Sequence, residues 1–248
     1  MPILIIEGTE IEAGLVLFDF DGTLVDGGDR HRNLARARRE TIERHAGLEA
    51  VANWARLSGV DLETGRVDPE GPLARAPRRG DLAIAAAAVY LTGRIWHESM
   101  RLAAEAYEEA DAFLESTYRS VLLPGVGEAL GRMRGVGFRL GIATNGEGSS
   151  VEAMARVLGV DRLFEIVVGA GDVADAKPAP DMILLACRRV GVDPGETVFV
   201  GDSPEDMLAG KRAGVRALIS VNNPDERVRG AADYALDSVG DILVRASV

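Results

Sequence analysis

The chain has 248 residues, of which 47% are hydrophobic, so it can bury a core and is near the length at which one core divides. Its formal net charge of −11 makes nucleic acid and an anionic membrane surface unfavourable partners. No apolar run approaches the ~20 residues that a membrane span needs, and the first residues lack a basic, signal-like segment, so we expect a cytoplasmic protein.

The first strand predicted by the sequence is the apolar run Leu15–Phe18, which ends at Asp19 and leads to a turn at Gly22. Apolar residues then recur at helical spacing up to about residue 48, and again over residues 103–117. Glycine and proline are frequent in residues 58–80, which predicts a loop, and Asp81 is placed to cap an alanine-rich helix after it. Residues 25–120 are therefore predicted to be helical, with no clear strands.

Strand and helix patterns alternate from residue 124 onward. Repeated strand–helix units predict an α/β fold with a doubly wound, mainly parallel, Rossmann-like sheet that has helices on both faces. The strand that ends at Asp19 belongs to this sheet, so the helical block 25–120 is an insertion after the first strand. The predicted strands are 138–144, 166–168, 197–200 and 216–221, and the predicted helices are 125–134, 149–158, 181–190 and 204–213.

Three of the predicted strands end in polar residues. The first runs into Asp19 and Asp21, the second into Thr144, and the third into Asp202. Open parallel sheets bind ligands at the carboxyl ends of their strands, so we expect these ends to meet in one crevice. Asp19 and Asp21 would face the same side of an extended chain, where two carboxylates repel unless a cation lies between them. Magnesium prefers such oxygen ligands, which predicts a Mg²⁺ site.

Each polar residue has a simpler explanation when it is taken alone. Thr144 could cap a helix, Lys177 could be a surface charge, and Asp206 could offset a helix dipole. Asp19 and Asp21 could be solvated turn residues. Their order along one predicted sheet favours a shared site over these separate roles.

At these residues the sequence resembles the haloacid-dehalogenase-like (HAD) superfamily. The resemblance extends over about 14–24 and 121–245, and it implies an α/β core formed by 1–24 and 121–248 with a helical cap domain at 25–120. The cap would resemble that of phosphoglycolate-phosphatase-like members, with hinges at Val25–Gly28 and Ser120–Pro124. The matching segments are Asp19-Phe20-Asp21-Gly22-Thr23-Leu24, Thr144-Asn145, Lys177-Pro178, and Gly201-Asp202 with Asp206.

The resemblance implies a magnesium-dependent phosphatase. Asp19 would attack phosphorus and become a phospho-aspartate, and Asp21 would protonate the leaving oxygen and then activate water. Thr144 would hold the transferring phosphoryl group, and Lys177 would offset its charge. The implied metal ligands are Asp19, Asp21 (through its backbone carbonyl), Asp202 and Asp206, although Asp206 could instead orient the waters of the ion. The implied substrate-binding residues are Asn145, Gly146 and His31.

Substrate choice is less well defined by the sequence. The resemblance implies a small phosphorylated metabolite, and Asp21 favours an oxygen ester over a carbon–halogen or phosphonate bond. His31 could touch the leaving group or could pack within its helix, and the arginines of the loop (Arg75, Arg78 and Arg79) could bind a second anionic group. Two alternatives stay open: a phosphomutase of the same family, and a non-catalytic phosphate-binding regulatory protein.

Overall fold

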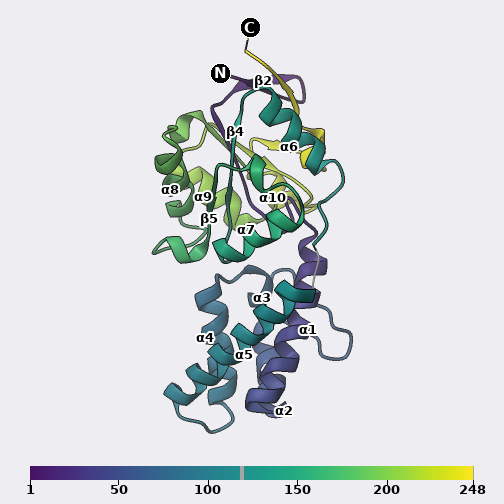
Figure 1. The fold of residues 1–248 in the computed structure, drawn as a ribbon, viewed down its shortest axis with the longest axis vertical. Coiled ribbons are helices and arrows are strands. Elements are labelled where there is room, and N and C mark those ends of the chain that lie inside the picture. Colours follow the sequence, from purple (N-terminus) through teal and green to yellow (C-terminus); the bar gives the residue numbers. More distant parts are fainter. Residues whose placement is uncertain (118–119, 248) are drawn as a thin grey trace. The chain divides into compact units, whose positions relative to one another are not determined.

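The computed structural model describes residues 1–117 and 120–247. The chain forms two compact units, Met1–Asp26 with Ser120–Val248 (the α/β unit) and Gly27–Arg119 (the helical unit) (Figure 1). The helical unit is inserted into the α/β unit after the first strand of the main sheet. Among the described residues, no helix has both the length and the apolar character to cross a membrane.

The main sheet of the α/β unit has six strands in the order β5-β4-β3-β6-β7-β8, and every neighbouring pair is parallel. This confirms the predicted parallel sheet, although the short edge strand β8 was not foreseen. The strands are β3 (Leu15–Phe18), β4 (Arg139–Ala143), β5 (Ile166–Val168), β6 (Thr197–Gly201), β7 (Ala217–Ser220) and β8 (Tyr234–Ala235).

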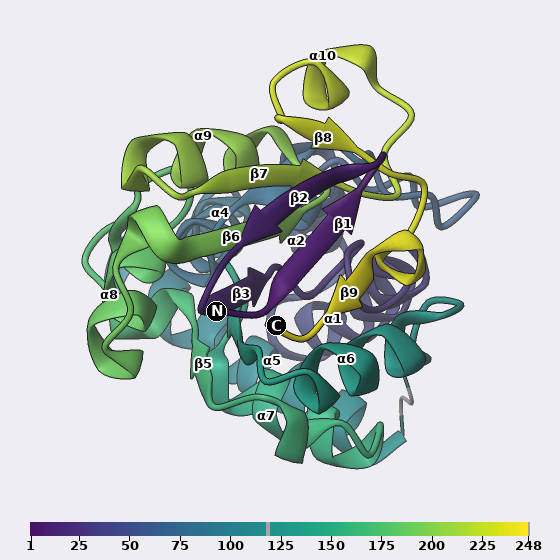
Figure 2. The same cartoon turned by 90° about the horizontal axis from the view of Figure 1, so that it is seen from above.

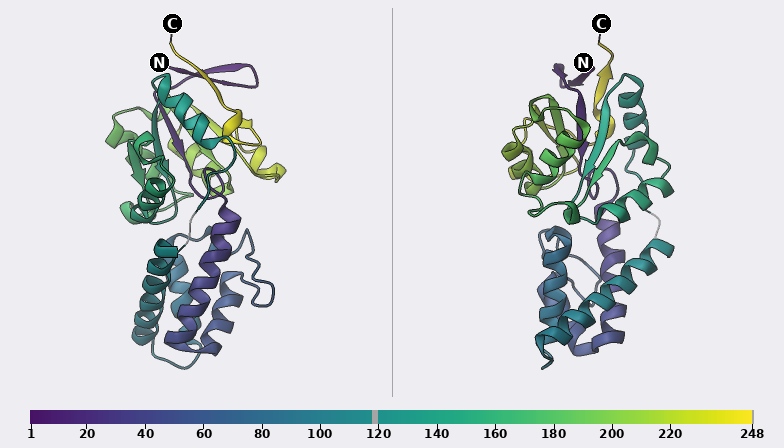
Figure 3. Two further views of the ribbon diagram at one scale, coloured as in Figure 1. Left: turned by 45° about the vertical axis from the view of Figure 1, so that its right-hand side comes forward. Right: turned by 60° about the vertical axis from the view of Figure 1, so that its left-hand side comes forward.

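Both faces of the main sheet are covered, which is why its strands are continuous apolar runs. In β3, Val16 and Phe18 pack into the core on the side of α6 and α7, while Leu15 and Leu17 pack into the core on the side of α8 and α9. Figure 3 shows these two helical layers on opposite sides of the strands. The helices are α6 (Val126–Gly135), α7 (Gly148–Val157), α8 (Asp181–Val190), α9 (Pro204–Ala213) and the short α10 (Glu226–Arg229), and the 3-10 turns are η1 (Asp161–Leu163), η2 (Ala170–Asp172), η3 (Pro194–Glu196) and η4 (Val239–Asp241).

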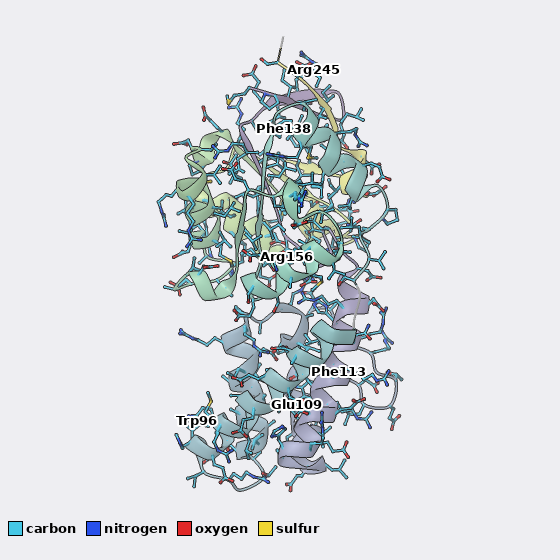
Figure 4. The ribbon with its side chains drawn as sticks, viewed as in Figure 1. Trp96, Glu109, Phe113, Phe138, Arg156 and Arg245 are labelled. Carbon is cyan, nitrogen blue, oxygen red and sulfur yellow. The ribbon has the colours of Figure 1, made fainter. Side chains whose placement is uncertain are left out.

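A second, antiparallel sheet, which the sequence did not predict, joins the two ends of the chain. Its order is β2-β1-β9, formed by Thr9–Glu12, Ile3–Ile6 and Leu243–Arg245. Figure 2 shows β1 beside β2 and β9, and Figure 4 labels Arg245 on β9. Leu4, Ile6 and Ile11 are buried and extend the core on the α6 side. A strand from each end of the chain therefore covers that core.

The helical unit contains five helices among its described residues and has its own apolar core. The predicted loop at residues 58–80 was wrong in part, because it contains a short helix and an isolated bridge between Val60 and Val67. Figure 4 labels Trp96, Glu109 and Phe113 along the last helix. The helices are α1 (Gly27–Ala46), α2 (Leu48–Ser58), α3 (Pro72–Arg75), α4 (Arg78–Tyr90) and α5 (Trp96–Thr117).

Asp81 does not cap a helix, so that prediction was wrong. Helix α4 starts three residues earlier, after Pro77, and Asp81 is buried within it. Its carboxylate pairs with the Arg38 guanidinium of α1 and accepts a hydrogen bond from the Tyr107 hydroxyl at 3.0 Å. Trp54 donates to the same hydroxyl at 3.1 Å. The carboxylate therefore has a charged partner inside the helical core instead of backbone N–H groups.

The two connections between the units lie side by side on the α/β unit. Val25 and Leu122 form an antiparallel bridge, and the Leu123 N–H donates to the Leu24 carbonyl at 2.9 Å. Both connecting segments are therefore hydrogen-bonded to each other where they leave the α/β unit. The predicted cap range 25–120 includes residues 118–119, which lie outside the described residues, and a hinge function for either connection stays a prediction.

Candidate active site

Strand register brings the predicted polar residues to one edge of the main sheet. Phe18 of β3 is paired with Ile142 of β4 and with Val200 of β6. The next residue, Asp19, donates its N–H to the Val200 carbonyl at 2.9 Å. The polar residues that follow β4 and β6 therefore emerge beside Asp19, as the parallel topology predicts.

A buried charge cluster lies at this edge. The Lys177 ammonium is 2.5 Å from Asp19 Oδ1 and 2.6 Å from Asp206 Oδ1. All three residues are buried, with exposed fractions of 3% for Lys177, 7% for Asp19 and 0% for Asp206. Lys177 is therefore not a surface charge. A buried charge needs partners, and the carboxylates of Asp19 and Asp206 supply them. The structure joins Asp19, Lys177 and Asp206, which are distant in sequence.

Asp206 is tied into its helix as well as to Lys177. Its Oδ2 accepts hydrogen bonds from Ser203 N–H at 3.0 Å, Ser203 Oγ at 2.7 Å and Asp202 N–H at 3.2 Å. Ser203 in turn caps α9 by accepting from the Asp206 N–H, which completes a capping box. Ser203 was not among the predicted site residues, although the spacing Ser203-x-x-Asp206 is a capping signal. Asp206 therefore orients the Asp202–Ser203 backbone.

Asp202 lies against the turn that follows β3. Its Oδ1 accepts a hydrogen bond from the Thr23 hydroxyl at 3.2 Å. Gly22 has φ of +86°, and a Cβ there would lie 2.3 Å from Asp202 Oδ2. Glycine is required both for the backbone conformation and for this close approach. Thr23 belongs to the segment Asp19–Leu24, and its contact with Asp202, 179 positions away, was not predicted.

The loop after β4 contains the other predicted phosphoryl-binding residues. Thr144 is buried, and its Oγ1 accepts from the Gly146 N–H at 3.1 Å. Asn145 donates from Nδ2 to the Lys177 backbone carbonyl at 3.1 Å. Asn145 therefore anchors the segment that presents the buried lysine. No contact of these residues with a phosphoryl group is tested, so their substrate roles stay predictions.

Two predicted residues remain, Asp21 in the α/β unit and His31 in the helical unit. Asp21 lies in the turn after β3 and forms a bridge with Val25. His31 is partly exposed on α1 of the helical unit. Its predicted substrate contact is not tested.

Three carboxylates form a group suited to a cation. Oxygen atoms of Asp19, Asp202 and Asp206 all lie within 4.8 Å of one another, and the Asp21 carboxylate is not in this group. Only one ammonium, that of Lys177, offsets them within the described hydrogen bonds and ion pairs. An excess of carboxylate oxygens in a partly enclosed site fits a hard divalent cation such as Mg²⁺.

A family model for haloacid dehalogenase-like hydrolases matches residues 14–214. The chain belongs to this HAD-like hydrolase family. The phosphoglycolate phosphatase of Escherichia coli (strain K12) is 30% identical over 234 residues, which cover 92% of this chain and 90% of that protein. This HAD-like hydrolase is therefore a phosphatase, as predicted.

Two solved structures have a similar fold. CbbY from Rhodobacter sphaeroides, solved in complex with phosphate, has a TM-score of 0.65 and 27% identity, with 92% of this chain and 95% of CbbY covered. A predicted phosphoglycolate phosphatase from Haemophilus somnus has a TM-score of 0.69 at 20% identity, with 92% and 96% covered, which supports the fold alone.

In this HAD-like phosphatase, burial and neighbouring charges shift the pKa values of Asp19 and Lys177. Burial raises the pKa of Asp19 to about 7; Lys177 opposes this rise, while Asp206 and Asp21 add to it. Burial alone would lower the pKa of Lys177, but Asp19 and Asp206 together raise it above its ordinary value. A nearby cation would favour the ionised carboxylate of Asp19.

This pKa predicts a pH-dependent stability for the metal-free phosphatase. The unfolded chain releases the Asp19 proton near its ordinary pKa of 3.8, whereas the folded chain keeps it up to about 7. The folded state binds more protons between these values, so its free energy of unfolding falls as pH rises from about 4 to about 7. Urea unfolding with a chelator present measures this slope. The slope should be smaller in Asp19→Asn, and an equal slope in both proteins would contradict the Asp19 pKa.

Proposed function

We propose that this phosphatase hydrolyses a small phosphate monoester with Mg²⁺, through a phospho-aspartate formed on Asp19. One observation carries the proposal: the Asp19 carboxylate is held by the buried Lys177 ammonium at 2.5 Å, at the edge where three strands end. A carboxylate in this position has a fixed direction and a cationic neighbour. Both properties suit a nucleophile that attacks an anionic phosphoryl group.

The proposed reaction has two steps. In the first, an Asp19 oxygen bonds to phosphorus, the ester P–O bond breaks, and Asp21 gives a proton to the leaving alcohol. In the second, water attacks the phosphorus of the acyl phosphate while Asp21 takes a proton from it. The bond to Asp19 breaks, inorganic phosphate leaves, and the carboxylate is restored. Thr144 and Lys177 would contact the transferring oxygens in both steps.

The carboxylates of Asp19 and Asp202 and the backbone carbonyl of Asp21 would hold the Mg²⁺ ion. Bound Mg²⁺ would reduce the repulsion between the carboxylates and the substrate phosphate. Asp206 would act through its hydrogen bonds to the Asp202–Ser203 backbone and through Lys177, because its oxygens already accept from these groups. This role is an alternative to the predicted ligand role of Asp206, whose carboxylate also belongs to the group of three.

The helical unit would act as a cap that selects substrate and excludes water from the phospho-aspartate. His31 is the proposed cap residue near the leaving group. The full-length similarity to a phosphoglycolate phosphatase makes a small phosphorylated carboxylic acid the first substrate class to test. We also propose a cytoplasmic location, as the sequence predicts.

A phosphate-release screen with Mg²⁺ tests the proposal. The panel contains 2-phosphoglycolate, sugar monophosphates, a sugar bisphosphate and phosphorylated hydroxy acids. We expect phosphate release from at least one small monoester without any activator. Isomerisation of a sugar phosphate that requires a bisphosphate activator would instead identify a phosphomutase. Phosphate binding without turnover of any compound would favour the non-catalytic alternative.

Removal of the cation should stop turnover. With excess chelator we expect at least a ~100-fold loss of phosphate release, because the substrate phosphate would then face three carboxylates and one ammonium. Added Mg²⁺ should restore the rate, whereas Ca²⁺ should restore less of it, since Ca²⁺ takes more ligands at longer distances. Full turnover in chelator would contradict the metal requirement.

A further inference from the structure

Two consecutive asparagines, Asn222 and Asn223, follow β7 and donate hydrogen bonds to the segments that follow β3 and β6. Pairing of β7 with β6 continues past the strand end, because the Val221 N–H donates to the Gly201 carbonyl at 3.0 Å. Asn222 then adopts φ of +54°, in the left-handed region that favours glycine and asparagine. The chain after β7 thus places the Asn223 amide beside the loop that follows β6 and the Asn222 amide beside the turn that follows β3.

Each asparagine donates to a different backbone carbonyl. Asn223 Nδ2 donates to the Asp202 carbonyl at 2.6 Å, and Asn222 Nδ2 donates to the Gly22 carbonyl at 2.9 Å. Asn223 Oδ1 also accepts from the Asp225 N–H at 2.7 Å, which fixes the direction of its amide group. The pair therefore links the β3 turn, the β6 loop and the β7 loop.

Asp202 is held from three sides by this arrangement. Its N–H donates to Asp206 Oδ2 at 3.2 Å, its carbonyl accepts from Asn223, and its carboxylate accepts from the Thr23 hydroxyl. With both backbone groups fixed, the side chain leaves the backbone in one direction. That direction points the carboxylate at Gly22, whose missing Cβ makes the required space.

We propose that Asn223, assisted by Asn222, is a positioning residue that directs the Asp202 carboxylate toward the divalent cation. The proposal rests on the proposed function, because it assumes a cation held by Asp202. Neither asparagine is among the proposed ligands. Their effect passes through the peptide groups of Asp202 and Gly22, in the way that outer hydrogen bonds set the affinity of a metal ligand.

Direct measurement of Mg²⁺ binding tests the role. Isothermal titration of the substrate-free protein should show a ~10- to 100-fold weaker Mg²⁺ affinity for Asn223→Ala than for the wild type. In turnover assays the Mg²⁺ concentration for half-maximal rate should rise, while kcat at saturating Mg²⁺ should stay close to the wild-type value. Asn222→Ala should show a smaller loss, because its side chain is exposed and its acceptor is the turn carbonyl.

Two further variants separate positioning from general stability. Asn53→Ala removes an amide that donates to the Ala88 carbonyl in the helical unit, so it is a matched control and should keep wild-type Mg²⁺ affinity. Asn223→Asp keeps the acceptor toward Asp225 and loses the donor toward Asp202. We expect weaker Mg²⁺ binding here despite the added negative charge, with little change in the chelator-treated melting temperature.

The possible failures are distinguishable. Wild-type Mg²⁺ affinity in folded Asn223→Ala and Asn223→Asp would overturn the positioning role and leave the proposed function intact. A wild-type protein that turns over substrate but binds no Mg²⁺ would overturn the metal requirement, and the positioning role with it.

Discussion

Asp19→Asn should reduce phosphate release to less than ~0.1% of the wild-type rate while the protein stays folded. The amide nitrogen and oxygen of asparagine have no negative charge to attack phosphorus, so the covalent step is lost. The fold should persist, because the side chain keeps its size and Lys177 keeps its contact with Asp206 at 2.6 Å. Steady-state phosphate release, with circular dichroism to show folding, measures both outcomes.

A matched substitution controls for the loss of a carboxylate as such. Asp237→Asn changes a side chain that is 92% exposed in the same unit, and it should leave turnover unchanged. Activity of folded Asp19→Asn within tenfold of the wild type would show that another group attacks phosphorus.

Arg38→Met should destabilise the helical unit by about 3–5 kcal/mol. Arg38 and Asp81 form a buried pair, with side chains only 5% and 4% exposed, and the guanidinium lies 4.1 Å from the centre of the Tyr107 ring. Removal of the arginine leaves the Asp81 carboxylate buried, and within the described part of the chain the Tyr107 hydroxyl is then its one side-chain donor. Chemical unfolding followed by helical circular dichroism measures the change.

Two controls separate the buried pair from arginine in general. Arg44→Met removes an exposed ion pair in the same unit, between Arg44 of α1 and Glu109 of α5, and should cost less than about 1 kcal/mol. The double variant Arg38→Met with Asp81→Leu removes both charges and should be more stable than Arg38→Met alone. A double variant as unstable as the sum of its single changes would contradict a coupled pair.

The main sheet and the polar residues at its edge could be predicted from local sequence patterns. Leu15–Phe18 is apolar at every position, which requires a strand covered on both faces, and the polar residues after β3, β4 and β6 follow from parallel topology. The antiparallel sheet was missed because β1 and β9 have only 4 and 3 residues, and their pairing joins opposite ends of the chain. No local signal specifies such a distant contact.

Residues whose place depends on tertiary hydrogen bonds were harder to foresee than those at strand ends. Asp81 matched a local capping pattern, but a tertiary partner, Arg38, determined its place. Asn223 acts through a backbone carbonyl 21 positions away, and a carbonyl has no residue identity in the sequence. Sequence patterns therefore predicted which charged side chains lie at the site. The orientation of these side chains depends on tertiary hydrogen bonds, which the patterns do not show.

Chemical trapping of the phosphoenzyme tests the central claim most directly. Wild-type protein is mixed with Mg²⁺ and a substrate from the screen, quenched in acid during turnover, and reduced with borohydride, which converts an aspartyl phosphate to homoserine. Peptide mass spectrometry should find homoserine at position 19, and only when substrate was present. Homoserine at another aspartate, or none at position 19 in repeated quenches during rapid turnover, would contradict Asp19 as the nucleophile.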